Sequence, residues 1–181
     1  MKRISLYTAL VFVILLLGIF ALGYMLESTK FEHKITIQAP IEKAFKNIAS
    51  HELKPLLYQN IIADGTIIED YEEGNTSKVC YGNEDLKCFT EEILKIDSLH
   101  ELSLKTVASR FTTTTNIYFT PSYLRTKLHI KEDIRGNSAF DRAMLYFIKN
   151  PVLKHRKNYY KLIKSAVEST PDYDINPEEL K

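Results

Sequence analysis

Residues 31–48, FEHKITIQAPIEKAFKNI, contain the change of pattern that decides the fold of this chain. From Phe31 to Gln38, one side of the chain is mostly apolar and the other polar, and this period of two predicts a β-strand. Ala39-Pro40 ends the alternation, and proline is favoured in the first turn of a helix. From Ile41 to Ile48 the apolar residues recur at helical spacing. The stretch therefore predicts a strand that runs directly into a helix.

Downstream, the sequence predicts one more short helix and then a series of strands. The helix spans His51 to Gln59, where Pro55 predicts a bend or two shorter turns. The runs that follow are rich in β-branched and aromatic residues, and turn-like pieces such as Pro121-Ser122 separate them. Because these spacers are short, neighbouring strands are expected to pair antiparallel. The predicted strands are Thr66–Tyr71, Lys78–Tyr81, Leu86–Ile96, His100–Ala108, Thr112–Thr120 and Tyr123–Ile134.

The last predicted element is a long helix. Apolar residues recur at helical intervals from Phe140 to Ala166, and Ser138 is suited to cap the helix start. Asn150-Pro151 is expected to kink or interrupt it, because proline cannot continue the hydrogen-bond ladder. Residues 170–181 contain prolines and several acids, which predicts a disordered tail.

Directly after the first strand, five residues match a known family pattern. The pattern has a small residue followed by proline, then an acidic residue two positions later, and then a small residue and an aromatic one; the matching residues are Ala39, Pro40, Glu42, Ala44 and Phe45. With the closing helix around Tyr160 to Glu168 and the order of the elements, the chain resembles the SRPBCC superfamily, the START-like or polyketide-cyclase-like domains. The resemblance covers roughly Phe31 to Ser169. One departure is the absence of the tryptophan that often follows the two short helices, which places the chain at a distance from the cyclase-like and activator-like branches.

The resemblance implies an α+β helix-grip fold, with a curved antiparallel sheet of about seven strands, two short helices after the first strand and a long C-terminal helix. In that family a cavity lies between sheet and helix. Many members bind lipids, sterols or other apolar ligands there, and a few are enzymes. The superfamily has no universal catalytic set, so no catalytic residue is carried over to this chain.

An apolar segment precedes the domain. Ile4 to Leu26 contains no charge and no proline, and as a helix it is about 35 Å long, enough to cross a membrane. Lys2 and Arg3 before it favour an orientation in which the domain faces out, toward the periplasm or the cell surface. A signal peptide cleaved before Tyr24 is the alternative, but the run exceeds the usual signal core of roughly 7–15 residues. The expected organisation is a single-pass anchor at 1–26, a short linker at 27–30, the domain at 31–169 and the tail.

Charge argues against nucleic acid as a partner. The chain has 24 basic and 23 acidic residues, and without Lys2 and Arg3 the balance is close to neutral. A nucleic-acid-binding domain needs a concentrated basic patch, which is not visible here.

The two cysteines flank a turn-like segment, Gly82 to Asp85. If the hairpin is centred on Glu84, Cys80 faces Cys88, and Val79 faces Phe89 on the other side. Facing residues are close enough for a disulfide, which an outward-facing domain would allow to form. Two free, half-buried thiols are the alternative. With no histidine nearby at ligand spacing, no metal site is expected.

The resulting functional hypothesis is a membrane-tethered, non-catalytic domain that binds a hydrophobic small molecule or lipid, without a cofactor. The alternatives are an enzyme of the cyclase or hydrolase kind, with His33 as the better acid–base candidate, and a membrane-anchored protein-interaction module. The side chains expected to wall the cavity, unless they simply pack as core, are Phe45, Leu57, Tyr58, Phe119, Leu128, Ile130, Met144, Phe147 and Ile148.

Overall fold

The computed structural model describes residues 2–49, 61–62, 72–81 and 87–170 of the chain. Its elements are α1 (Lys2–Met25), β1 (Thr29–Ile37), α2 (Ile41–Ala49), β2 (Ile61–Ile62), β3 (Thr76–Tyr81), β4 (Lys87–Asp97), β5 (Glu101–Ala108), β6 (Phe111–Ser122), β7 (Arg125–Gly136), α4 (Ala139–Phe147) and α5 (Lys149–Ser169). The helix predicted at His51–Gln59, the strand predicted at Thr66–Tyr71 and the tail from residue 171 lie outside the described residues.

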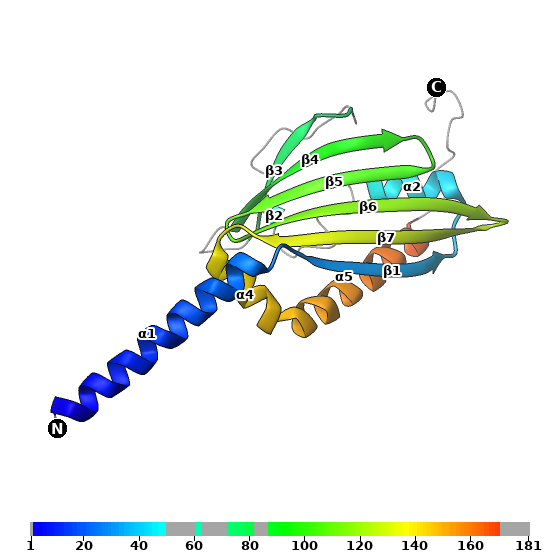
Figure 1. Cartoon of the computed structure of the whole chain (residues 1–181). Helices are drawn as coiled ribbons and strands as arrows, with labels where there is room; N and C mark the ends of the chain where they lie inside the picture. Colours follow the sequence, from blue (N-terminus) through cyan, green and yellow to red (C-terminus); the bar gives the residue numbers. More distant parts are fainter. Residues whose placement is uncertain (1, 50–60, 63–71, 82–86, 171–181) are drawn as a thin grey trace.

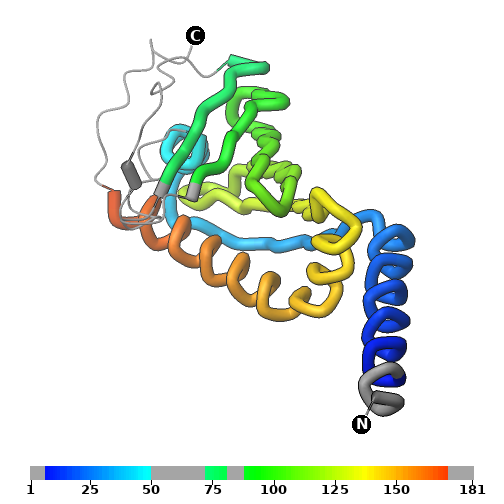
Figure 2. Tube along the Cα trace, turned by 90° about the vertical axis from the view of Figure 1, so that its left-hand side faces the viewer, coloured from blue at the N-terminus to red at the C-terminus, as the bar shows by residue number. Residues whose placement is uncertain are grey.

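The strands form one seven-stranded antiparallel sheet in the order β1-β7-β6-β5-β4-β3-β2. The sheet is curved, and α5 runs along its inner face (Figure 1; Figure 2). The first strand therefore pairs with the last, with Ile35 opposite Leu128. This is the α+β helix-grip architecture expected from the sequence.

The junction between β1 and α2 has the form that its sequence predicts. Ile37 is fully buried at the end of β1, and the amide of Ala44 donates to the carbonyl of Pro40 across 3.0 Å in the first turn of α2. Between them, the buried hydroxyl of Thr126 donates to the carbonyl oxygen of Ala39 across 2.8 Å. This bond ties the chain reversal to β7, so the opening stretch is fixed against the last strand.

The core fills the part of the sheet that α2 and the second half of α5 cover. Phe45 and Phe119 meet there with their ring centroids 5.0 Å apart, and Leu128 is 2% exposed. Burying one such large side chain stabilises a fold by about 1.5–3 kcal/mol. Other members of this cluster are Ile37, Ala44, Ile93, Leu102, Ile117, Ile130, Tyr160, Ile163 and Val167.

The C-terminal helix is interrupted, but not at the expected residues. α4 ends at Phe147, and Ile148 (φ −96°, ψ 11°) lies between it and α5. Pro151, without an N–H, cannot donate to the carbonyl four residues earlier, that of Phe147. The break therefore falls at Ile148, and Pro151 lies in the first turn of α5, where proline is tolerated.

The turn between β6 and β7 also differs from the expectation. Pro121 and Ser122 were expected to separate the strands, but they pair with Thr126 and Arg125 in the ladder. The turn lies at Tyr123 and Leu124, and Tyr123 takes a positive φ of 58°. Tyrosine is rarely found in that conformation, so composition gave no signal for the turn.

Helix α1 projects away from the domain (Figure 1). Among the described residues it is the one helix long and apolar enough to cross a membrane, over Tyr7–Met25. A signal sequence passes the same test, so this feature alone is weak support for an anchor. Because α1 ends at Met25 and β1 begins at Thr29, the connection is Leu26–Ser28, shorter than the expected linker.

Candidate functional site: a cavity with a buried carboxylate

A cavity of about 420 Å³ lies between the inner face of the sheet and α5. Strands β4 to β7 form one wall, the end of α2 and Leu145 of α4 contribute to the lining, and α5 from Val152 to Ile163 lies opposite. Apolar lining residues include Ile48, Phe89, Leu104, Ile134 and Tyr159. The volume lies within the range of about 300–1,000 Å³ typical of small-molecule sites.

The cavity lies further along the strands than the side chains expected to wall it. Phe45, Phe119, Leu128 and Ile130 pack together in the core and are not among the lining residues. The lining on β6 and β7 comes from other positions of the same inner face, including Ile117 and Ile134.

The remaining expected wall residues lie elsewhere. Met144 and Ile148 are half-buried, and Phe147 is 62% exposed on the outer side of α4. None of these three lines the cavity, and Leu57 and Tyr58 lie outside the described residues.

Glu132 is the feature of this cavity that the sequence analysis missed. It lies on the inner face of β7 between Ile130 and Ile134, it lines the cavity, and it is only 3% exposed. An acid at an inward position of an otherwise apolar alternation is the signal that could have identified it.

One oxygen of the Glu132 carboxylate carries all its contacts. Oε1 accepts the hydroxyl of Tyr160 at 2.6 Å and the hydroxyl of Thr115 at 3.3 Å, and Nη1 of Arg156 lies 3.6 Å away. Arg156 and Tyr160 are four residues apart on α5, so both project from one helix face toward the strand. Oε2 is buried and has no hydrogen-bond partner among the described residues.

The electrostatics keep the phenol of Tyr160 as a donor. Burial raises the pKa of Tyr160 well above its usual value, and the negative charge of Glu132 and the hydrogen bond to it act in the same direction. Arg156 opposes this effect. Tyr160 is therefore neutral at physiological pH and holds Oε1, while Oε2 is buried without a hydrogen-bond partner among the described residues.

His33 lies beside this network and not in the cavity lining. Its half-buried ring stacks on the ring of Tyr160, with centroids 5.8 Å apart, and next to Phe31 at 6.2 Å. Burial lowers the pKa of His33, and the positive charge of Lys157 lowers it further. A neutral, stacked imidazole without cavity access has the geometry of a packing residue.

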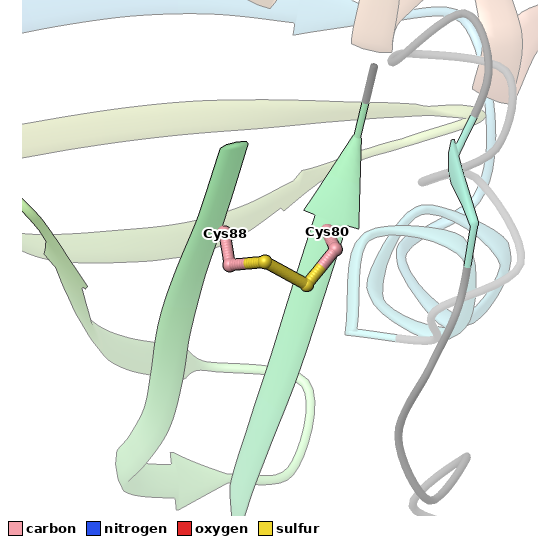
Figure 3. Close-up of a disulfide and its surroundings, with 2 residues drawn as sticks. All are labelled: Cys80 and Cys88. Carbon is pink, nitrogen blue, oxygen red and sulfur yellow. A yellow bond between two sulfur atoms is a disulfide. The ribbon is translucent and has the colours of Figure 1, made fainter. Parts of the chain in front are cut away.

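The cysteines are bonded. The register of β3 and β4 pairs Cys80 with Cys88 and Val79 with Phe89, as the hairpin centred on Glu84 requires. Figure 3 shows the bond between the two strands, with Cα atoms 4.1 Å apart. Because Phe89 is both next to Cys88 and part of the cavity lining, the disulfide holds the strand pair at the edge of the cavity.

The described residues contain no group of three or more histidine, cysteine, aspartate or glutamate side chains that could hold a metal ion. What the arrangement offers is a largely apolar chamber whose polar lining includes the buried carboxylate of Glu132. Such a chamber can hold a ligand with a donor at one end, and a carboxylate there can also accept a proton.

Comparison with known proteins identifies the fold. No family model matches the chain, and no curated protein matches its sequence. Among solved structures, Ara h 8.0201 superposes with a TM-score of 0.63 at 18% identity, covering 79% of this chain and 99% of that one. The aromatase/cyclase from Streptomyces sp. R1128 gives 0.61 at 12% identity, covering 78% and 94%. Norcoclaurine synthase from Thalictrum flavum gives 0.59 at 11% identity, covering 80% and 96%.

The chain shares the helix-grip fold of these proteins. Each of them is covered almost completely, so the likeness concerns the whole domain and not a fragment. At these identities the likeness establishes the fold, and function is argued from the residues of the cavity.

Proposed function

We propose that this chain is a membrane-tethered, SRPBCC-type binding protein for a hydrophobic small molecule or lipid that has a hydrogen-bond donor at one end. The observation that carries the proposal is the buried Oε2 of Glu132, which lacks a hydrogen-bond partner among the described residues and belongs to a side chain that lines a cavity of about 420 Å³. The ligand's apolar body packs against the walls, and its hydroxyl or amine donates to Oε2.

The energetics support a ligand of this kind. An unsatisfied buried polar group costs about 1–3 kcal/mol, and more when it is charged. A purely hydrocarbon ligand would leave Oε2 without a hydrogen bond, whereas a hydroxyl or ammonium would supply one. One structure of norcoclaurine synthase holds dopamine and hydroxybenzaldehyde, which combine an aromatic body with hydroxyl or amine donors.

The tether and the orientation are part of the proposal. Exposed apolar side chains run along α1 from Tyr7 to Met25, and Lys2 and Arg3 favour an inside position for the N-terminus. The disulfide between Cys80 and Cys88 fits a domain that faces an oxidising compartment.

A cyclase-type enzyme is the second candidate, favoured by the bond from Tyr160 to Glu132. A carboxylate beside a cavity can remove a proton from a bound substrate through Oε2, while a neutral phenol positions the other oxygen. Conversion of a bound ligand, seen as a mass change after incubation with the wild type but not with E132Q, would favour this candidate.

Ligand binding is tested on the full chain purified in detergent. Native mass spectrometry identifies what co-purifies, and melting temperatures are compared for matched ligands that differ in one terminal hydroxyl, amine or methyl group. A specific ligand raises the melting temperature by mass action. We expect the hydroxyl- and amine-bearing members to do so more than the methyl member.

The variant E132Q tests the role of the carboxylate, because the amide keeps the shape but presents an N–H₂ group where Oε2 was. E92Q is the matched control, since Glu92 pairs with Lys105 outside the cavity lining. Equal stabilisation of E132Q and wild type by the donor-bearing ligands would contradict the proposed contact. No shift with any ligand would contradict the binding function.

The tether is tested separately by extracting membranes with alkaline carbonate. Retention of the full-length chain in the pellet is expected. Release into the supernatant, or an N-terminus at Tyr24 by mass, would contradict the anchor.

A further inference from the structure

We infer that α4 is a membrane-interface helix, held at the lipid headgroup level by a fixed joint with α1. The inference rests on the proposed tether and goes beyond it, because it names a second surface that contacts the bilayer. Its partner is the boundary between headgroups and acyl chains.

The joint is built around Gly23, in the last turn of α1. A Cβ at this position would lie 1.8 Å from the carbonyl oxygen of Ala139, so only glycine allows the two helices to approach this closely. Ala143, one turn after Ala139, is also fully buried. Small residues in both helices therefore permit close backbone contact, as they do between membrane helices.

Arg142 fastens the joint. Its Nε–H donates to the carbonyl oxygen of Gly23 across 2.7 Å, and its guanidinium lies 6.0 Å from the ring centre of Tyr24. The carbonyls of a last helical turn lack partners within the helix and carry the negative end of its dipole. A cation from the domain is thus bound directly to the end of α1.

The joint also bears on the alternative of a cleaved signal. Cleavage before Tyr24 would remove Gly23, and with it the acceptor that Arg142 uses. The close approach at Ala139 exists only in a chain that keeps α1.

The joint fixes the depth of α4. Gly23 is two residues before the end of α1, and only Leu26–Ser28 separate α1 from β1. Both views show α4 beside the end of α1 that joins the domain (Figure 1; Figure 2). If α1 spans the bilayer, α4 therefore lies at the level of its last turns, which is the interface.

The exposed side chains at this level suit that environment. On α4, Phe140 is 38%, Tyr146 57% and Phe147 62% exposed, and at the end of α1 Tyr24 is 76% and Met25 82% exposed. Tyrosine gathers at membrane interfaces because its apolar ring and its hydroxyl both find suitable surroundings there, and phenylalanine adds apolar area that packs against acyl chains.

Charge complements the aromatic side chains. Lys149, the first residue of α5, is exposed, and Lys154 is exposed further along α5. A cation near the membrane surface attracts anionic headgroups by about 1 kcal/mol.

The position of α4 also links membrane and cavity. Leu145, on the side of α4 away from solvent, is 3% exposed and lines the cavity. One helix thus forms both a wall of the ligand chamber and the inferred contact with lipid.

The test uses the absence of tryptophan from the chain, which makes an introduced tryptophan a unique depth probe. F147W and the control Y123W are reconstituted as full chains in vesicles of zwitterionic and anionic lipid with brominated acyl chains. Tyr123 is 96% exposed in the β6–β7 turn, at the end of the sheet far from α1 (Figure 1). We expect F147W emission to shift to the blue and to be quenched about twofold, and Y123W emission to be unchanged. If the emission of F147W, like that of Y123W, is neither shifted to the blue nor quenched, the inference is wrong.

The joint is tested by adding G23L to F147W. The larger side chain separates the helices, so quenching of the tryptophan is expected to fall while carbonate-resistant retention stays the same. Undiminished quenching would overturn the role of Gly23. Release of F147W itself by carbonate would instead refute the tether, and the cavity binding measured in detergent is independent of both results. F140W, read in the same way, replaces F147W if that variant fails to fold.

Discussion

Tyr160 of α5 donates its hydroxyl proton to Glu132 of β7 across 2.6 Å, and the bond joins the gripping helix to the sheet inside the protein. Tyr160 is 2% exposed and Glu132 is 3% exposed, so water does not compete for either group. The bond therefore has two consequences. It stabilises the position of α5 over the sheet, and it occupies Oε1 of Glu132 while Oε2 has no hydrogen-bond partner among the described residues.

Y160F is predicted to destabilise the fold by about 1–3 kcal/mol, because it removes the shortest bond to a buried carboxylate. Chemical denaturation of the full chain in detergent measures the loss. Y123F, at an exposed tyrosine, is the control and should be neutral. A cost for Y160F no larger than that of Y123F would mean that the bond does not stabilise the fold.

Tyr160 is also predicted to be the last tyrosine to ionise. Its pKa is raised in the folded state, so its contribution to stability is complete below the unfolded value of about 10 and is lost as the pH rises through the folded value. Absorbance titration should show a phenol that ionises only as the protein unfolds, and this step should be absent in Y160F. If the absorbance titration of the wild type matches that of Y160F at high pH, Tyr160 does not have a raised pKa and the prediction is wrong.

Arg156 and Glu132 are predicted to be coupled. Nη1 of Arg156 lies 3.6 Å from Oε1, and the Arg156 side chain is 26% exposed, so water screens part of the attraction. R156M should destabilise by about 1–3 kcal/mol, because it leaves the buried carboxylate without its cation. The double variant E132Q/R156M should cost less than the sum of the single variants. Additive costs would show that the two side chains act independently.

The order of the elements could be predicted because each depends on local pattern. The alternation in β1, the helical spacing in α2 and the hairpin register around Cys80 and Cys88 are all contained within short stretches. The β6–β7 turn could not be predicted, because Tyr123 takes a positive φ and no glycine or asparagine indicates a turn there.

The site was harder to predict because it depends on how elements pack. The network at Glu132 joins β6, β7 and α5, whose relative placement no local pattern encodes. The inner face of the strands was identified correctly, but where along that face the core ends and the cavity begins depends on which part of it α2 and α5 fill.

The disulfide is predicted to contribute about 2–3 kcal/mol, from closure of a short loop in the unfolded chain between residues eight apart. The double variant C80S/C88S should lose this amount, and reductant should lower the melting temperature of wild type but not of the variant. Labelling of the denatured, non-reduced protein with a thiol reagent should find no free thiol. Two reactive thiols in protein isolated from its own compartment would show that the cysteines are free there.

His33 is predicted to make stability depend on pH in the mildly acidic range. Burial next to Tyr160, with Lys157 nearby, lowers its pKa below the ordinary value of 6.5, so the neutral ring is favoured in the folded protein. For a group whose folded pKa is lowered, the contribution is complete above the unfolded value and is lost as the pH falls through the folded value. The free energy of unfolding should therefore decline from about pH 6.5 downward, before the carboxylates titrate.

H33Q should flatten this decline, whereas H100Q, at an exposed histidine, should leave it unchanged. Denaturation curves at several pH values measure the slope, and NMR titration of the imidazole gives the pKa directly. A slope that survives H33Q would assign the pH dependence to another group.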